Sequence, residues 1–251
     1  MPGNYAHRHE IMFSQIEELK ALWKGSTVRR LNGNNTEIDV KIFPRPIQAE
    51  IPIWITSAGN TETFKKAGKI GAKILTHLLG QRIEDLEKNI AIYKQSLKES
   101  GYPSQDAKVA LMLHTYIGSD LDKVKSEVKE PFKFYLKSSI SLINNLAKSL
   151  NIKIEKIDER DENELLEIAF ERYWQTSALL GTKESCEVIV HKLASIGVTE
   201  IACLIDFGIA DEKVIEGLNY LNDLRKHLIN PLQHLSLQII KSQRYKLRLP
   251  I

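Results

Sequence analysis

The stretch IPIWITSAGNT, residues 51–61, is a short apolar run that ends in small and hydroxyl-bearing residues. Similar apolar runs follow: KILTHLL at residues 73–79, VALMLHTY at residues 109–116 and EIACLI at residues 200–205. Each run is followed by apolar residues at helical spacing. Continuous apolar strands that alternate with helices are typical of a parallel sheet covered on both faces, so the sequence predicts an α/β fold.

The number of such runs conflicts with the length of the chain. A chain of 251 residues has the usual size of a (β/α)8 barrel. We find four strands of this type, so we expect an open α/β sheet or half of a barrel. Residues 119–180 interrupt the alternation and predict a helical insertion, whose first helix starts near Asp120 and breaks at Pro131. Residues 27–43 predict a surface hairpin, because Asn32-Gly33 suits a tight turn between two alternating runs.

The charge distribution argues against several classes of function. The chain has 35 Lys and Arg against 32 Asp and Glu, and four of the cations follow Ile229 without any acid. We therefore interpret residues 230–251 as a basic tail or linker, and we expect no nucleic-acid face on the folded part. No apolar run approaches the roughly 18 residues of a membrane span. Cys186 and Cys203 lie in apolar periodic segments, which predicts buried reduced thiols in a cytoplasmic protein.

Polar residues gather where the predicted strands end, and the carboxyl ends of parallel strands meet at one edge of a sheet. Ser57, Ala58, Gly59, Asn60 and Thr61 lead from the first strand into a helix. The free N–H groups at a helix start suit a phosphate. The alternative is that Asn60 or Thr61 simply caps the helix, and from spacing alone the cap is the better interpretation.

Two histidines occur near the ends of neighbouring strands. His77 and His114 would lie close enough to share a pocket, where an imidazole could bind a ligand or move a proton near neutral pH. The alternative for each is a hydrogen-bonded core histidine. No set of His, Cys or carboxylate residues has the spacing of metal ligands, so we expect no metal. Asp206 follows the last strand, and there we favour helix capping over a ligand contact.

These segments, in this order, resemble the luciferase-like flavin-dependent monooxygenases, whose fold is a (β/α)8 barrel. The resemblance covers roughly residues 2–229 and is closest to the branch found beside or within nonribosomal peptide and polyketide assembly lines. It rests on NYAHR (4–8), LWKG (22–25), FPRPIQ (43–48), PIWITSAGN (52–60), LTHLLG (75–80), LHTYIG (113–118) and IACLIDFG (201–208).

The resemblance implies roles for the candidate residues and reverses the preference for a plain cap. Ser57–Thr61 would help to hold the phosphate of FMN, and His77 and His114 would contact the flavin or the substrate. Residues 119–180 would form a lid over the active site. The implied reaction uses O2 and reduced FMN (FMNH2), supplied by a separate flavin reductase, to oxygenate a small-molecule or carrier-bound substrate. Nonribosomal peptide or polyketide synthase modules are implied partners.

The resemblance also assigns the four predicted strands to the fifth to eighth of the barrel. Strands one to four would precede Met1, so residues 1–229 are expected to be a C-terminal half that needs an N-terminal half or a second subunit. We therefore expect the isolated chain to bind FMN poorly. Two alternatives stay open: a deazaflavin-dependent oxidoreductase of the same fold, and a truncated fragment or partner subunit that is not an enzyme on its own.

Overall fold

The computed structural model describes residues 4–137, 159–229 and 236–239, and it divides into two units, Met1–Ile53 and Trp54–Ile251. In the first unit, helix α1 (Arg8–Lys24) ends where Gly25 adopts a positive φ of 98°. Strands β1 (Val28–Leu31) and β2 (Glu37–Val40) pair antiparallel, so the expected hairpin is present. The prediction of a tight turn at Asn32-Gly33 was wrong. Residues 32–36 form a longer loop whose positive φ falls at Asn35, and the Asn32 side chain accepts hydrogen bonds from two N–H groups of this loop.

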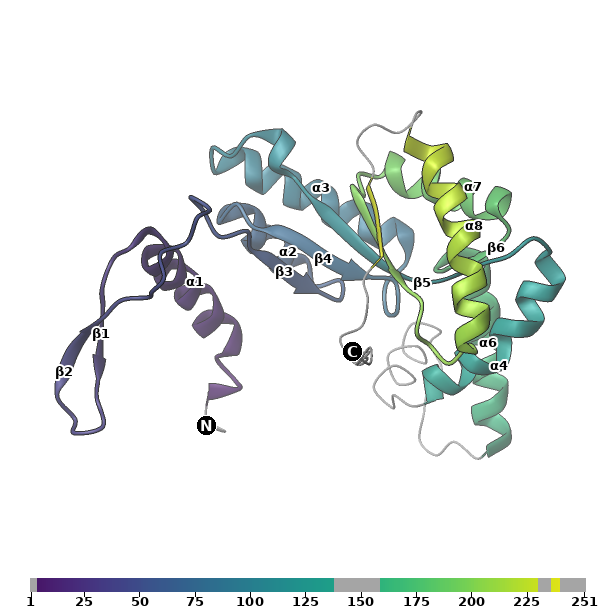
Figure 1. The fold of residues 1–251 in the computed structure, drawn as a ribbon, viewed down its shortest axis with the longest axis horizontal. Helices are drawn as coiled ribbons and strands as arrows, with labels where there is room; N and C mark the ends of the chain where they lie inside the picture. The colour runs from purple at the N-terminus through teal and green to yellow at the C-terminus, as the bar shows by residue number, and fades with distance from the viewer. Residues whose placement is uncertain (1–3, 138–158, 230–235, 240–251) are drawn as a thin grey trace, which may run out of the picture. The chain divides into compact units, whose positions relative to one another are not determined.

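The second unit contains a parallel sheet, which confirms the predicted α/β class (Figure 1). The four predicted strands are β3 (Trp54–Ser57), β4 (Lys73–His77), β5 (Val109–Ile117) and β7 (Glu200–Leu204). The elements between and after them are α2 (Thr61–Lys69), α3 (Ile83–Glu99), the 3-10 helix η2 (Ser104–Asp106), α7 (Lys183–Ser195) and α8 (Asp211–Ile229).

Two further strands were not predicted. Strand β6 (Leu179–Gly181) pairs with the last residues of β5, and its three residues are too few to show a periodic pattern. Strand β8 (Ser236–Ile239) pairs in parallel with β7, although it lies in the segment interpreted as a tail. The order β3-β4-β5-β7-β8, with β6 on β5, gives an open sheet of six strands among the described residues. Residues 240–251 lie outside the described residues.

The two faces of the sheet near β3 and β4 differ in burial. Ile55, Ile74 and Thr76 are buried on the face next to α2, whereas Leu75 and His77, which alternate with them along β4, are only half-buried. A parallel sheet ordinarily buries both faces under helices. Here the carboxyl ends of β3 and β4 therefore open onto a partly exposed face.

Helices α4 (Leu121–Lys137) and α6 (Glu159–Thr176) form the described part of the expected insertion. The prediction that the first helix breaks at Pro131 was wrong, because α4 continues for six residues beyond it. The reason is packing: Val128, Phe132 and Leu136, on both sides of the proline, are all buried in one apolar cluster with α6, β5 and β6. Residues 138–158 lie outside the described residues.

Both cysteines lie in the core of the second unit. Cys186 and Cys203 are buried free thiols, as predicted, and burial raises the pKa of Cys186 to about 12 and that of Cys203 to about 11. Among the described helices, none combines the length and apolar character that a membrane crossing requires.

Candidate functional site

The parallel register brings the candidate residues of the first two strands to one edge of the sheet. Ser57 of β3 lies beside Thr76 of β4, and His77 lies beside Met112 of β5. The residues after β3 lead directly into α2, which begins at Thr61. The sheet therefore places the loop of residues 57–61 next to His77, as the sequence predicted.

A buried hydrogen-bond network fixes this loop to β4. The Thr76 hydroxyl donates to the Ser57 carbonyl oxygen at 2.6 Å. The Gln81 side-chain NH2 donates to the Thr76 hydroxyl and to the His77 carbonyl, each at 2.8 Å. Gln81 is buried and its Oε1 has no hydrogen-bond partner among the described residues. Because two acceptors already fix the orientation of its amide, Oε1 is an acceptor that the fold leaves unpaired.

Gly59 is the loop residue with a positive φ. Its φ is +106°, a value that residues other than glycine rarely adopt. A Cβ added there would lie 3.1 Å from Gln81 Oε1. Asn89 of α3 contacts the loop at this glycine and two residues later: its NH2 donates to the Gly59 carbonyl at 3.2 Å, and its Oδ1 accepts the Thr61 hydroxyl at 2.8 Å. Asn89 thus ties the loop to α3 at two points.

The start of α2 has both a side-chain cap and free N–H groups that could bind a phosphate. Asn60 does cap the helix, because its Oδ1 accepts the Thr63 N–H at 3.0 Å. The N–H groups of Thr61 and Glu62 precede those that bond Asn60, so the cap leaves them available, and the side chains of Ala58, Asn60 and Thr61 are exposed. Ser57 is buried, and its hydroxyl makes a long 3.5 Å contact with the Asn60 carbonyl. Exposed small residues and free helix-start N–H groups fit a phosphate such as that of FMN.

His77 lies at the end of β4 and is half-buried. Its Nδ1 lies 3.2 Å from the Leu79 N–H and accepts that hydrogen bond. Burial lowers the pKa of His77, so the neutral imidazole is favoured. A neutral ring that accepts at Nδ1 has its proton on Nε2, so Nε2 is the atom able to donate to a ligand.

His114 lies inside β5, three residues before its end, rather than at the strand terminus as expected. It is 2% exposed and surrounded by the rings of Phe132, Tyr135 and Phe207, whose centroids lie 4.8, 4.7 and 5.4 Å from its own. Burial, with the nearby His77 as a smaller cause, lowers the pKa of His114 to about 3. Its burial fits the alternative of a core histidine, but its Nε2 has no hydrogen-bond partner in the described structure.

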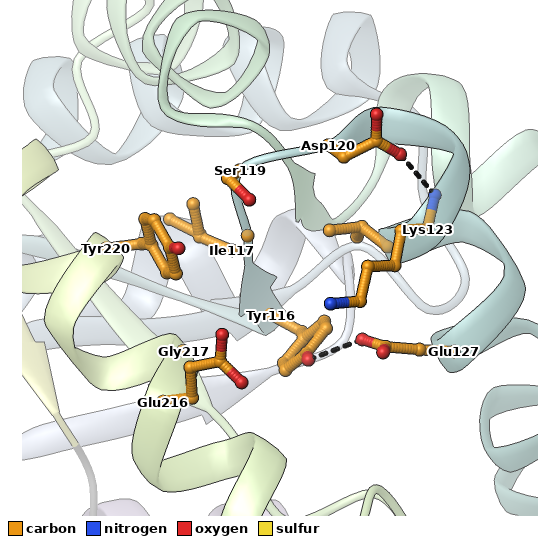
Figure 2. Close-up of a pocket in the computed structure, with 11 residues that line it drawn as sticks. Tyr116, Ile117, Ser119, Asp120, Lys123, Glu127, Glu216, Gly217 and Tyr220 are labelled. Carbon is orange, nitrogen blue, oxygen red and sulfur yellow. Dashed lines mark hydrogen bonds between the residues drawn. The ribbon is translucent and has the colours of Figure 1, made fainter.

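A separate small pocket lies where β5, α4 and α8 meet, and Figure 2 shows its lining. The Tyr116 hydroxyl donates to Glu127 Oε2 at 2.7 Å, and Lys213 of α8 donates to Glu127 Oε1 at 2.6 Å. The hydrogen bond to Lys213, followed by that from Tyr116, lowers the pKa of Glu127. The lining includes none of the predicted site residues, and its hydrogen bonds join three elements, so we interpret it as a structural clamp.

Sequence reasoning missed the residues that support the loop, and it missed Glu127 of the separate clamp. Asn89 gave a detectable signal, because a polar residue falls on the apolar face of α3 between Leu86 and Tyr93 and is buried there. Gln81 and Glu127 gave no signal, since nothing in a helical or alternating pattern indicates which distant group a side chain reaches.

Asp206, which follows the last predicted strand, is exposed. No cluster of His, Cys, Asp or Glu in the described part of the chain could hold a metal.

Solved structures with similar folds include two monooxygenases, one of them in complex with FMN, and a reductase that depends on coenzyme F420. The oxygenating part of 3,6-diketocamphane monooxygenase from Pseudomonas putida, solved with FMN, aligns at a TM-score of 0.59 and 13% identity, covering 85% of this chain and 61% of the other. The EDTA monooxygenase of Chelativorans sp. BNC1 gives 0.59 and 14%, with 89% and 61% covered. A coenzyme F420-dependent tetrahydromethanopterin reductase from Methanopyrus kandleri gives 0.54 and 20%, with 81% and 60% covered.

The chain therefore spans about 60% of the length of these structures, and at such identities the similarity concerns the fold. No curated protein sequence matches the chain. Residues 3–200, however, match the luciferase-like monooxygenase family, and this match spans most of the chain, including the loop after β3, His77 and His114. The chain belongs to the luciferase-like monooxygenase family.

Proposed function

We propose that this chain forms the flavin-binding C-terminal half of an FMN-dependent monooxygenase. The observation that supports this most strongly is the edge of the sheet at which β3 and β4 end. There the fixed loop of residues 57–61, the open start of α2 and the donor of His77 lie together on adjacent strands. An anion and a planar polar ring are the two parts of FMN that such an arrangement suits.

In this proposal the exposed residues Ala58, Asn60 and Thr61 and the N–H groups at the start of α2 hold the phosphate. His77 donates from Nε2 to the flavin or the substrate, and His114 gives the same side of the sheet a neutral, water-excluded wall. Bound FMN, once reduced by a separate reductase, would supply the electrons with which O2 oxygenates the substrate. The chain's own work is to bind, orient and exclude water.

We further propose that β3, β4, β5 and β7 correspond to the fifth to eighth strands of a barrel, with residues 1–229 as its C-terminal half. The partly exposed face of β3 and β4 supports this, because in a closed barrel that face would be covered by the remaining strands. The insertion of residues 119–180 would then act as a lid. A small or carrier-bound substrate from natural-product assembly, with synthase modules as partners, completes this proposal.

Coenzyme F420 is the second candidate, because one of the similar folds belongs to an F420-dependent reductase. Equilibrium titration of the full-length chain with FMN and with F420, each followed by cofactor fluorescence, separates the two. The proposal expects FMN to bind more tightly than F420 but weakly, because the proposed N-terminal half would supply the rest of the pocket. It also expects a polypeptide with the first four βα units of a luciferase-like barrel to strengthen FMN binding. Tighter binding of F420 would favour the deazaflavin alternative.

Two charge substitutions at the start of α2 test whether the phosphate binds there. Substitution of the exposed Thr61 by Glu places a negative charge at the helix start and should weaken FMN binding at least tenfold through repulsion of the phosphate. Glu62→Gln is the control of opposite sign: it removes a negative charge one residue later and should strengthen FMN binding. If neither substitution changes the affinity for FMN, the phosphate does not bind at this helix.

A further inference from the structure

Strand β8 occupies a position that the sequence did not suggest. It pairs in parallel with β7 over four residue pairs, from Glu200 with Ser236 to Cys203 with Ile239. On its other side β7 pairs with β5 over five residue pairs. In Figure 1 β8 is the yellow strand beside the green β7. The edge of β7 is therefore covered by a segment that follows α8, and among the described strands β8 is the last on that side of the sheet.

This inference rests on the proposed half-barrel. If β7 is the eighth strand, its outer edge is the place where the first strand pairs, because a (β/α)8 barrel closes the eighth strand against the first. We infer that β8 is an intrachain cap that fills the first strand's place. Any partner chain that closes the barrel at this edge must displace β8, whereas it can add to β3 directly, since no described strand pairs with the outer side of β3.

The physical reason for a cap is the chemistry of a sheet edge. An uncovered edge presents a row of unpaired N–H and C=O groups, which invites pairing with another chain and aggregation. β8 satisfies the outward groups of β7 from within the same chain. With four residue pairs it covers most of β7 but forms a short contact, and short edge pairings open more readily than central ones. A cap of this kind prevents aggregation of the unassembled chain at this edge and can be displaced by a longer strand of a partner chain.

Hydrogen–deuterium exchange of the full-length chain tests the cap. The variant Leu237→Pro/Gln238→Pro removes two consecutive N–H groups of β8, and Leu237→Ala/Gln238→Ala is the matched control that keeps them. In a parallel pair only alternate residues bond to a given neighbour, so about half of the β7 amides face β8. We expect the proline variant to accelerate exchange of those amides at least tenfold, with β4 unchanged, and to self-associate in sedimentation. Unchanged β7 exchange in that variant would overturn the inference.

A cross-link provides a second test that does not depend on the proline variant folding normally. Glu200→Cys/Ser236→Cys joins two residues that are paired in the register, whereas Glu200→Cys/Gln238→Cys is out of register by two residues. The inference expects a disulfide under mild oxidation in the first variant only, and equal cross-linking of both would contradict it. Neither test involves flavin. A failure here leaves the FMN proposal standing, and a failed FMN titration leaves the pairing of β8 intact.

Discussion

The buried imidazole of His114 leads to a quantitative prediction about stability and pH. The folded chain holds His114 neutral with a pKa of about 3, whereas the unfolded chain has the ordinary histidine value of 6.5. Protons therefore bind the unfolded chain preferentially between these values. The stability associated with the neutral ring is complete above pH 6.5 and is lost as the pH falls from 6.5 toward 3.

The size of the effect follows from linkage. Each pH unit below 6.5 costs about 1.4 kcal/mol, so at pH 5.0 the folded chain is destabilised by about 2 kcal/mol through His114 alone. The variant His114→Leu removes the ionisable group from a site that is 2% exposed. It also removes the unpaired Nε2, whose burial costs about 1–3 kcal/mol, so the variant should be at least as stable as wild type at pH 7.5.

Urea denaturation at pH 7.5 and pH 5.0 measures both the stability of the variant at pH 7.5 and the loss of stability at low pH. Between the two pH values, wild type should lose about 2 kcal/mol more than His114→Leu. Any change in packing caused by the leucine is common to both pH values and cancels in this difference. His77 contributes in the same direction, but it is present in both proteins. His9→Leu, at an exposed position, is the control. An equal pH dependence in wild type and His114→Leu would refute the placement of the imidazole in a water-excluded aromatic site.

Three further substitutions test the packing and the loop. Gly59→Ala should destabilise the chain by about 1–2 kcal/mol because of its positive φ, whereas Gly80→Ala, with nothing within 4 Å of the added Cβ, should be close to neutral in the same denaturation assay. Phe132→Ala should cost about 3–5 kcal/mol, against less than about 0.5 kcal/mol for Phe134→Ala, since Phe132 is fully buried and Phe134 is 74% exposed. Glu127→Gln should lower stability near pH 7 through the lost charge beside Lys213. The difference from wild type should vanish as the pH falls through the lowered carboxylate pKa; a constant difference would contradict the clamp.

The parts of the fold that sequence predicted are those with strong local patterns. The apolar runs before Ser57, His77 and Ile205 and the helical spacing of α3 depend on residues close together in the chain, so periodicity alone located them. The hairpin was found for the same reason, but its turn was not, because the Asn32 side chain bonds to the loop backbone and moves the positive φ to Asn35. The preference of Asn-Gly for tight turns does not take this side-chain contact into account.

The parts that sequence missed depend on distant contacts. Pro131 predicts a helix end locally, but the buried rings and aliphatic side chains on both sides of it hold α4 together. β8 has no pattern that distinguishes it from a tail until β7 is placed beside it. At the candidate site, the loop of residues 57–61 was located correctly, whereas its supports, Gln81 and Asn89, come from 20 to 30 residues further along and were not.

A comparison of FMN with riboflavin tests most directly whether the start of α2 binds the phosphate of FMN. The two flavins share the ring system and differ in the phosphate, so a common contribution from His77 and His114 cancels in the ratio of their affinities. We predict that the full-length chain binds FMN at least tenfold more tightly than riboflavin, and that Thr61→Glu abolishes most of this ratio. Equal affinities of the wild-type chain for the two flavins would contradict the claim.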